Sequence, residues 1–135
     1  MGYKIDQIEG IGAVYAEKLQ AAGVKTTEDL LEKCADKKGR VALAEETGIS
    51  EKLILKWTNH ADLFRITGIA GQFAELLEAS GVDTVKEFRH RVPANLHAKV
   101  TEVNAEKNLC NRVPSLSELE KMIAQAKELE PVITY

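Results

Sequence analysis

The sequence predicts an all-α protein of about 8 to 10 short helices with no sheet. Apolar residues recur at helical spacing along the chain, and no segment alternates with period two for long enough to form a strand. A third observation, an internal repeat, indicates that the helices belong to two related units.

The repeat relates residues 8–30 to residues 66–88 at a constant offset of 58, without a gap. Identical residues stand at many paired positions, including Ile8/Ile66, Gly10/Gly68, Ile11/Ile69, Ala16/Ala74, Leu19/Leu77, Gly23/Gly81, Val24/Val82 and Thr26/Thr84. Past residue 92 the alignment is no longer clean. We therefore predict two units, residues 1–65 and 66–135, packed as one compact domain.

Each unit is predicted to begin with a helix that follows a tight turn. In the first unit the turn is Gly10-Ile11-Gly12, and the helix carries an apolar stripe that ends at Gly23, a residue able to adopt φ > 0. The next helix begins at Thr26 with an acid three residues later, and Thr84 repeats this arrangement, which is typical of a capping box.

Two further helices follow from the same signals. Ser50 is predicted to cap a helix that carries Leu53, Trp57, Ala61 and Phe64 on one face. A last helix is predicted to begin at Pro114 and Ser117, with Glu120 three residues after the serine. Its inward face is predicted to carry Leu119, Met122, Ile123 and Ala126. We expect Trp57 to lie in the core and Cys34 and Cys110 to be buried and reduced.

Composition excludes several classes of protein. The 135 residues contain 18 Lys and Arg against 21 Asp and Glu, a formal net charge of −3, so strong nonspecific DNA affinity is not expected from charge alone. No apolar run is long enough to span a membrane, and we expect no membrane partner. The start shows no secretory signal, so we expect a cytoplasmic location.

The pattern Ile-x-Gly-Ile-Gly-x-x-x-Ala-x-x-Leu, which begins at Ile8 and recurs with changes at Ile66, resembles the helix-hairpin-helix motif of DNA repair, replication and recombination proteins. The continuation to Leu30 is also similar to the C-terminal domain of the bacterial RNA polymerase α subunit. Over nearly its whole length the chain is similar to an uncharacterised bacterial family, a domain of unknown function whose members have two such units.

The physics of the turn favours an anion site. A Gly-x-Gly turn that leads into a helix leaves backbone N–H groups unpaired at the positive end of the helix dipole. In helix-hairpin-helix proteins that bind DNA, this turn contacts a phosphate, so the resemblance implies the donors Gly10, Ile11, Gly12 and Ala13 in the first unit and Gly68, Ile69, Ala70 and Gly71 in the second. The alternative is that both turns only close helical hairpins.

Two departures favour the alternative. Ala70 replaces the second glycine of the pattern, and no Lys or Arg stands beside either turn, whereas Glu9 precedes the first. Basic residues gather elsewhere and could form two phosphate-binding patches: Lys33, Lys37, Lys38 and Arg40 in the first unit, and Lys86, Arg89, His90 and Arg91 in the second. They could equally be a solvated surface.

Catalytic patterns are weak, so we expect no enzyme, no cofactor and no metal. The stretch Val82-Asp83-Thr84 resembles the catalytic segment of helix-hairpin-helix DNA glycosylases, but a helix start explains it, and Gln72 stands where that family has its catalytic Lys. His60, His90 and His97 show no metal-ligand spacing with each other or with either Cys.

We therefore expect a binding module that contacts nucleic acid through its backbone, without sequence preference. The alternative is a module for protein interaction or self-association in which the hairpins are purely structural. The sequence leaves open the partner, the choice between DNA and RNA, the oligomeric state and the biological process.

Overall fold

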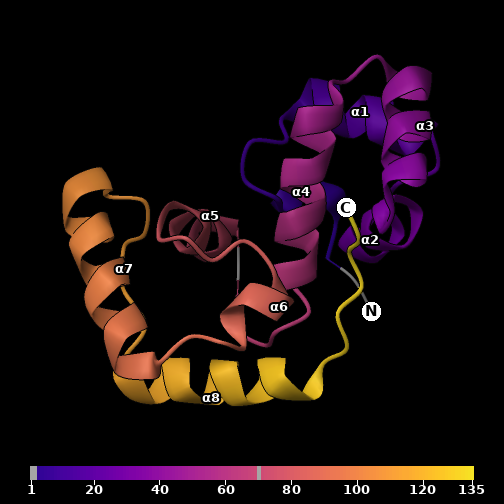
Figure 1. The fold of residues 1–135 in the computed structure, drawn as a ribbon. Coiled ribbons are helices and arrows are strands. Elements are labelled where there is room, and N and C mark those ends of the chain that lie inside the picture. Colours follow the sequence, from indigo (N-terminus) through magenta and orange to yellow (C-terminus); the bar gives the residue numbers. More distant parts are fainter. Residues whose placement is uncertain (1–2, 70) are drawn as a thin grey trace.

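The computed structural model describes residues 3–69 and 71–135, and these residues form eight α-helices and one short 3-10 helix (Figure 1). In chain order they are η1 (Ile5–Gln7), α1 (Ala13–Ala21), α2 (Thr27–Cys34), α3 (Lys37–Thr47), α4 (Glu51–Leu63), α5 (Gly71–Ala79), α6 (Val85–Phe88), α7 (Pro93–Lys107) and α8 (Leu116–Glu128). Within the described ranges there is no strand, only an isolated bridge between Lys4 and Thr26. The predicted all-α class is confirmed.

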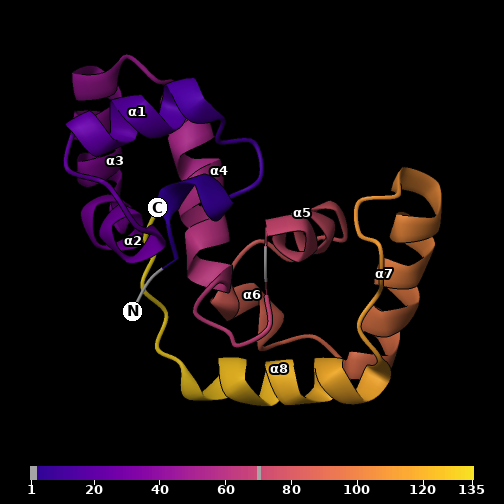
Figure 2. The same ribbon diagram turned by 180° about the vertical axis from the view of Figure 1, so that it is seen from behind.

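Helix α4 stands between two groups of helices, with α1, α2 and α3 on one side and α5 to α8 on the other (Figures 1 and 2). The buried apolar side chains form two clusters that follow this arrangement. One surrounds Leu19, Leu30 and Trp57, and the other surrounds Phe88 and Leu119. Since α4 places residues in both clusters, it is the element that joins them.

The predicted core positions of three residues are confirmed. Trp57 is only 1% exposed and lies in the first cluster, where its ring meets the ring of Tyr15. Cys34 and Cys110 are both buried free thiols, one in each cluster.

Paired positions of the repeat adopt the same local geometry. The glycines that close the turns have nearly equal φ angles: +93° at Gly10 and +92° at Gly68, then +89° at Gly23 and +94° at Gly81. The hydrogen bonds that end the helices also correspond, from the Val24 N–H to the Leu19 carbonyl and from the Val82 N–H to the Leu77 carbonyl, each 2.8 Å. Left-handed backbone is costly for any residue with a Cβ, which explains the glycines.

The predicted helix starts are confirmed at three places and wrong at one. Thr26, Ser50 and Thr84 each accept a backbone N–H from three residues along. The last helix begins at Leu116 with Ser115 as its cap, and not at Pro114 and Ser117 as expected. The capping box of Ser115 and Glu118 prevails because Arg112 also holds the Glu118 carboxylate through two hydrogen bonds.

The segment after α8 returns to the first group of helices, and Figure 1 shows it running toward α2. The Thr134 N–H donates to the Ala35 carbonyl at 2.7 Å, and Val132 and Ile133 pack against the first apolar cluster. Residues from the two ends of the chain therefore share one core. No described helix combines the length and apolar character that crossing a membrane requires.

Candidate nucleic-acid interface

The turn before α1 presents free backbone donors. The Ile11 N–H donates back to the Ile8 carbonyl, which closes the turn. The next three N–H groups, on Gly12, Ala13 and Val14, donate no hydrogen bond to any residue that the structure describes, and all three residues are exposed. A Cβ built on Gly12 would meet nothing within 4 Å, so the approach to these donors is open.

Most other helices cover their first turn with a side chain. The caps are Thr26 for α2, Asp36 for α3, Ser50 for α4, Thr84 for α6 and Ser115 for α8. Helix α1 has Gly12 at this position and no side-chain cap. Its positive end is therefore available to an outside acceptor. No cation adjoins it in the sequence, and the nearest charged residue along the chain is the exposed Glu9.

The second turn is engaged by its own molecule. The Thr67 N–H donates to the Gln125 side chain of α8 at 3.0 Å, and a Cβ at Gly68 would lie 3.2 Å from Met122. Gly71 lies directly against the backbone carbonyl of Gln7, where a Cβ would collide. Ile69 donates to the Ile66 carbonyl as its counterpart does in the first turn, and Ala70 lies outside the described residues. The two predicted anion sites are thus unequal: in the described residues the second turn packs against α8 and η1, whereas the space at Gly12 in the first turn is open.

Two of the basic residues share a structural task. Lys33 and Arg91 occupy paired positions of the repeat, and each donates to a carbonyl just beyond the first helix of its unit. Lys33 reaches the Ala22 carbonyl at 2.9 Å, and Arg91 reaches the Gly81 carbonyl at 2.8 Å. Arg91 is also paired with the Glu87 carboxylate at 2.7 Å. Cations at the negative end of a helix stabilise it, so their recurrence has an explanation without nucleic acid.

Arg40, expected on a surface patch, is only 2% exposed. Its guanidinium donates to the carbonyls of Cys34, Ala35 and Thr134, which ties the C-terminal segment to the end of α2. Five donors in a rigid fork suit Arg to this role. The expected surface position of Arg40 is therefore wrong.

The other basic residues remain at or near the surface. Arg89 is half-buried and donates to the Lys127 carbonyl at 3.1 Å. Lys37, Lys38 and Lys86 are exposed and have no ion-pair partner in the described part of the chain. Among the lysines and arginines of the two basic groups, these three have no side-chain hydrogen bond or ion pair to a described residue, so their ammonium groups are available to an outside partner.

A cavity that sequence reasoning missed lies between the end of α5 and the start of α7. Its volume is about 400 Å³, and its lining includes His90, Arg91 and Lys99 beside Ser80 and Asn95. Helix α7 begins there without a side-chain cap. Arg91 is already paired with Glu87, but Lys99 has no ion-pair partner among the described residues, and its ammonium beside the start of a helix favours an anion. Lys99 gave no signal in the sequence because the repeat cannot be followed past residue 92.

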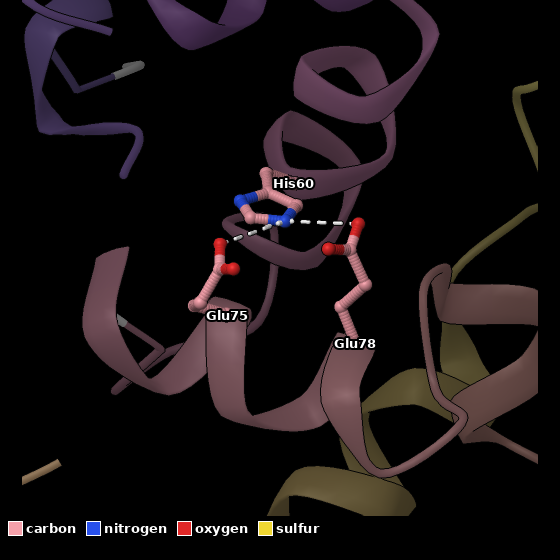
Figure 3. A group of neighbouring side chains, drawn as sticks. All are labelled: His60, Glu75 and Glu78. Atoms are coloured by element: carbon pink, nitrogen blue, oxygen red, sulfur yellow. Dashed lines mark hydrogen bonds and ion pairs between the residues drawn. The ribbon is translucent and has the colours of Figure 1, made fainter. Parts of the chain in front are cut away.

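A second group that the sequence did not indicate joins α4 to α5. Figure 3 shows Glu75 and Glu78 of α5 directed at the ring of His60, which comes from α4. His60 Nε2 lies 3.2 Å from Glu78 Oε2 and 3.9 Å from Glu75 Oε2. Lys56 Nζ lies 3.4 Å from Glu75 Oε1 and 3.3 Å from Glu78 Oε1. No local spacing in the sequence pairs His60 with these residues, because Glu78 lies 18 positions further along the chain on another helix.

Charge stabilises this group. Partial burial disfavours the charged form of Glu78, but the hydrogen bond from His60 and the charges of His60 and Lys56 outweigh it and hold the pKa of this carboxyl below its usual value. Burial likewise disfavours the ammonium of Lys56, but attraction to Glu78 and Glu75 raises its pKa. His60 is fully buried, and its Nδ1 has no partner within the described residues.

A family model described as a domain of unknown function, DUF4332, matches residues 9–129. The chain belongs to this family. The matched residues of this DUF4332 chain include the first turn from Glu9 onward, the second turn and the group around His60. Comparison of the DUF4332 chain with curated proteins and with solved structures found no match.

Proposed function

We propose that this protein binds the backbone of nucleic acid without sequence preference, through the turn that opens α1. The observation that carries the proposal is the row of exposed, unpartnered N–H groups on Gly12, Ala13 and Val14. Amide donors at the start of a helix bind phosphate well, because hydrogen bonds and the helix dipole act together. Such contacts position a nucleic acid but do not read its bases.

The resemblance of residues 8–19 to the helix-hairpin-helix motif supports the same proposal. In that family the turn contacts a phosphate. We extend this role to the first turn only, because the second turn packs against α8 and η1. The free lysines Lys37 and Lys38 belong to the same group of helices as α1 and would supply charge that the first turn lacks. Lys86 and the basic cavity near Lys99 belong to the other group and would add contacts only to a nucleic acid that spans both groups. With a net charge of −3, the affinity is expected to be modest and to fall with salt.

Fluorescence anisotropy with labelled duplex and single-stranded DNA, at several salt concentrations, tests the proposal. The decisive variant is Gly12→Asp. Gly12 has an ordinary φ of −84° and open space around it, so the new carboxylate caps the helix without strain but repels a phosphate. We expect binding to weaken by about tenfold or more, the usual worth of a hydrogen bond to a charged group.

The matched control is Ala124→Asp, which adds the same charge at an exposed position of α8, far from the turn in sequence. It should weaken binding much less. Gly10→Asp and Gly68→Asp are poor tests because both positions have φ above +90°, where a side chain strains the backbone. No binding tighter than millimolar at low salt, or equal losses in Gly12→Asp and the control, would contradict the proposal.

A protein-interaction module is the second candidate, favoured by Val14. This apolar side chain is 67% exposed in the first turn of α1, next to the free N–H groups. If the start of α1 docks on another protein or on a second copy, Val14→Asn should weaken that contact and leave DNA binding unchanged. Light scattering over a range of protein concentrations tests self-association directly.

A further inference from the structure

We propose that His60, Glu75 and Glu78 form a binding site for a divalent transition-metal ion of the zinc type. This inference does not depend on nucleic-acid binding. One ligand atom from each of the three residues lies within 4.8 Å of the other two. One imidazole nitrogen and two carboxylate oxygens are a ligand set that such ions accept.

The spacing of the donor atoms fits a metal ion. Zinc-ligand bonds of about 2.0 to 2.2 Å place neighbouring ligands of a tetrahedral site roughly 3.3 to 3.6 Å apart. The separation of His60 Nε2 from Glu78 Oε2 is already 3.2 Å, and its separation from Glu75 Oε2 is 3.9 Å. A small rotation of the Glu75 side chain would complete the geometry. Three protein ligands would leave one position for water.

The helices hold these groups in place. Glu75 and Glu78 are three residues apart on α5 and therefore share one face, toward which α4 presents His60 (Figure 3). The imidazole is fully buried, whereas the two carboxylates are 25% and 28% exposed, so an ion could enter from the carboxylate side. An ion here would join α4 to α5, a helix of the second group.

Lys56 is the main competitor for the carboxylates, and it leaves the required atoms free. Its ammonium contacts Oε1 of both glutamates, whereas Oε2 of both faces His60. Two carboxylates and one ammonium carry an excess negative charge when the imidazole is neutral. A proton on the imidazole or a metal ion can balance that charge. Both species place a hydrogen on the unpartnered Nδ1, so this nitrogen does not distinguish them.

Calorimetric titration of the metal-free full chain with zinc chloride tests the site. We expect one zinc ion per chain with micromolar affinity. Glu75→Gln and Glu78→Gln, which keep the shape of the side chains, should each weaken binding at least tenfold. Lys56→Met should tighten it, because the competing ammonium is gone. The matched control is Glu17→Gln, since Glu17 is exposed and occupies the position of Glu75 in the first repeat.

Three results would overturn the inference, provided that circular dichroism shows the variants folded. The first is the absence of binding tighter than millimolar in the unchanged chain. The second is a glutamine variant at position 75 or 78 that binds zinc as tightly as the control does, because the ion would then lie elsewhere. The third is a Lys56→Met chain with no gain in affinity, which would leave the cluster as an ion-pair network only.

Discussion

Replacing Gly71 with alanine gives the most direct test of how the second turn is packed. Gly71 is the first residue of α5. A Cβ at this position would collide with the backbone carbonyl of Gln7, because the end of η1 lies against the start of the helix. An added carbon would be far inside ordinary contact distance, so the helix start and the carbonyl would have to separate by about 1 Å. Overpacking of this kind costs about 1 to 3 kcal/mol.

Helix propensity acts against this cost but does not cancel it. Alanine is better than glycine inside a helix by at most about 1 kcal/mol. Because the clash is with a backbone carbonyl, its cost lies near the upper end of that range, about 2 to 3 kcal/mol, so the expected net loss for Gly71→Ala is about 1 to 2 kcal/mol in the free energy of unfolding. For a chain of this size, such a loss lowers the melting temperature by about 3 to 10 °C.

The control is the same substitution at Gly12, the open start of α1. A Cβ there meets nothing within 4 Å, and φ is −84°, so Gly12→Ala causes no collision. Alanine is a poorer N-cap than glycine, which lowers the free energy of unfolding by a few tenths of a kcal/mol to about 1 kcal/mol. The lower conformational entropy of the unfolded chain raises it by a similar amount. Urea and thermal denaturation of both variants measure the difference. Equal stability of the Gly71→Ala and Gly12→Ala chains would refute the account of the second turn as an internal contact.

Three further predictions concern other buried or paired groups. Arg40→Met removes the guanidinium from three backbone carbonyls, of which, among the described residues, only that of Ala35 keeps another donor, the Thr134 N–H. Urea denaturation should therefore show a loss of about 1 to 3 kcal/mol, and DNA affinity should stay within twofold of the unchanged chain. A folded variant with much weaker DNA binding would show that Arg40 belongs to the interface. Burial raises the pKa of the Cys34 thiol to about 11 and also raises the pKa of Cys110. Both thiols should therefore react with a thiol reagent at pH 8 only as fast as the chain opens. Rapid labelling of the folded protein would contradict their burial. The hydrogen bonds from Arg112 lower the pKa of Glu118 to about 2. This carboxylate therefore stabilises the start of α8 fully above pH 4.5 and progressively less as the pH falls toward 2. When thermal unfolding is measured against pH, the Glu118→Gln chain should be less stable than the unchanged chain at pH 7, and the difference should become small near pH 2.

Local interactions explain why much of the fold was predictable. The capping box at Thr26 joins residues three apart, and the helix stop at Gly23 depends on the φ angle of one residue. Helix α7 was missed although its signal was present: Pro93 at its first position is followed by Leu96, Val100 and Val103, which are buried at helical spacing. The repeat cannot be followed past residue 92, so this helix has no counterpart in the first unit to compare with.

The amino-acid sequence alone determined the helical class, the repeat and the position of the turn before α1, because each can be recognised from short stretches of the chain without knowing how they pack. The tertiary structure alone decided which of the matching features face outward. Arg40 is a cation in the sequence, but its guanidinium points inward at carbonyls, one of them 94 residues away. In the repeat, Gly71 corresponds to a residue of the open first turn, yet it packs against η1. His60 meets Glu75 and Glu78 only because α4 and α5 pack together. Contacts between distant segments have no local signature, so the sequence shows which groups are available and the packing determines what each one meets.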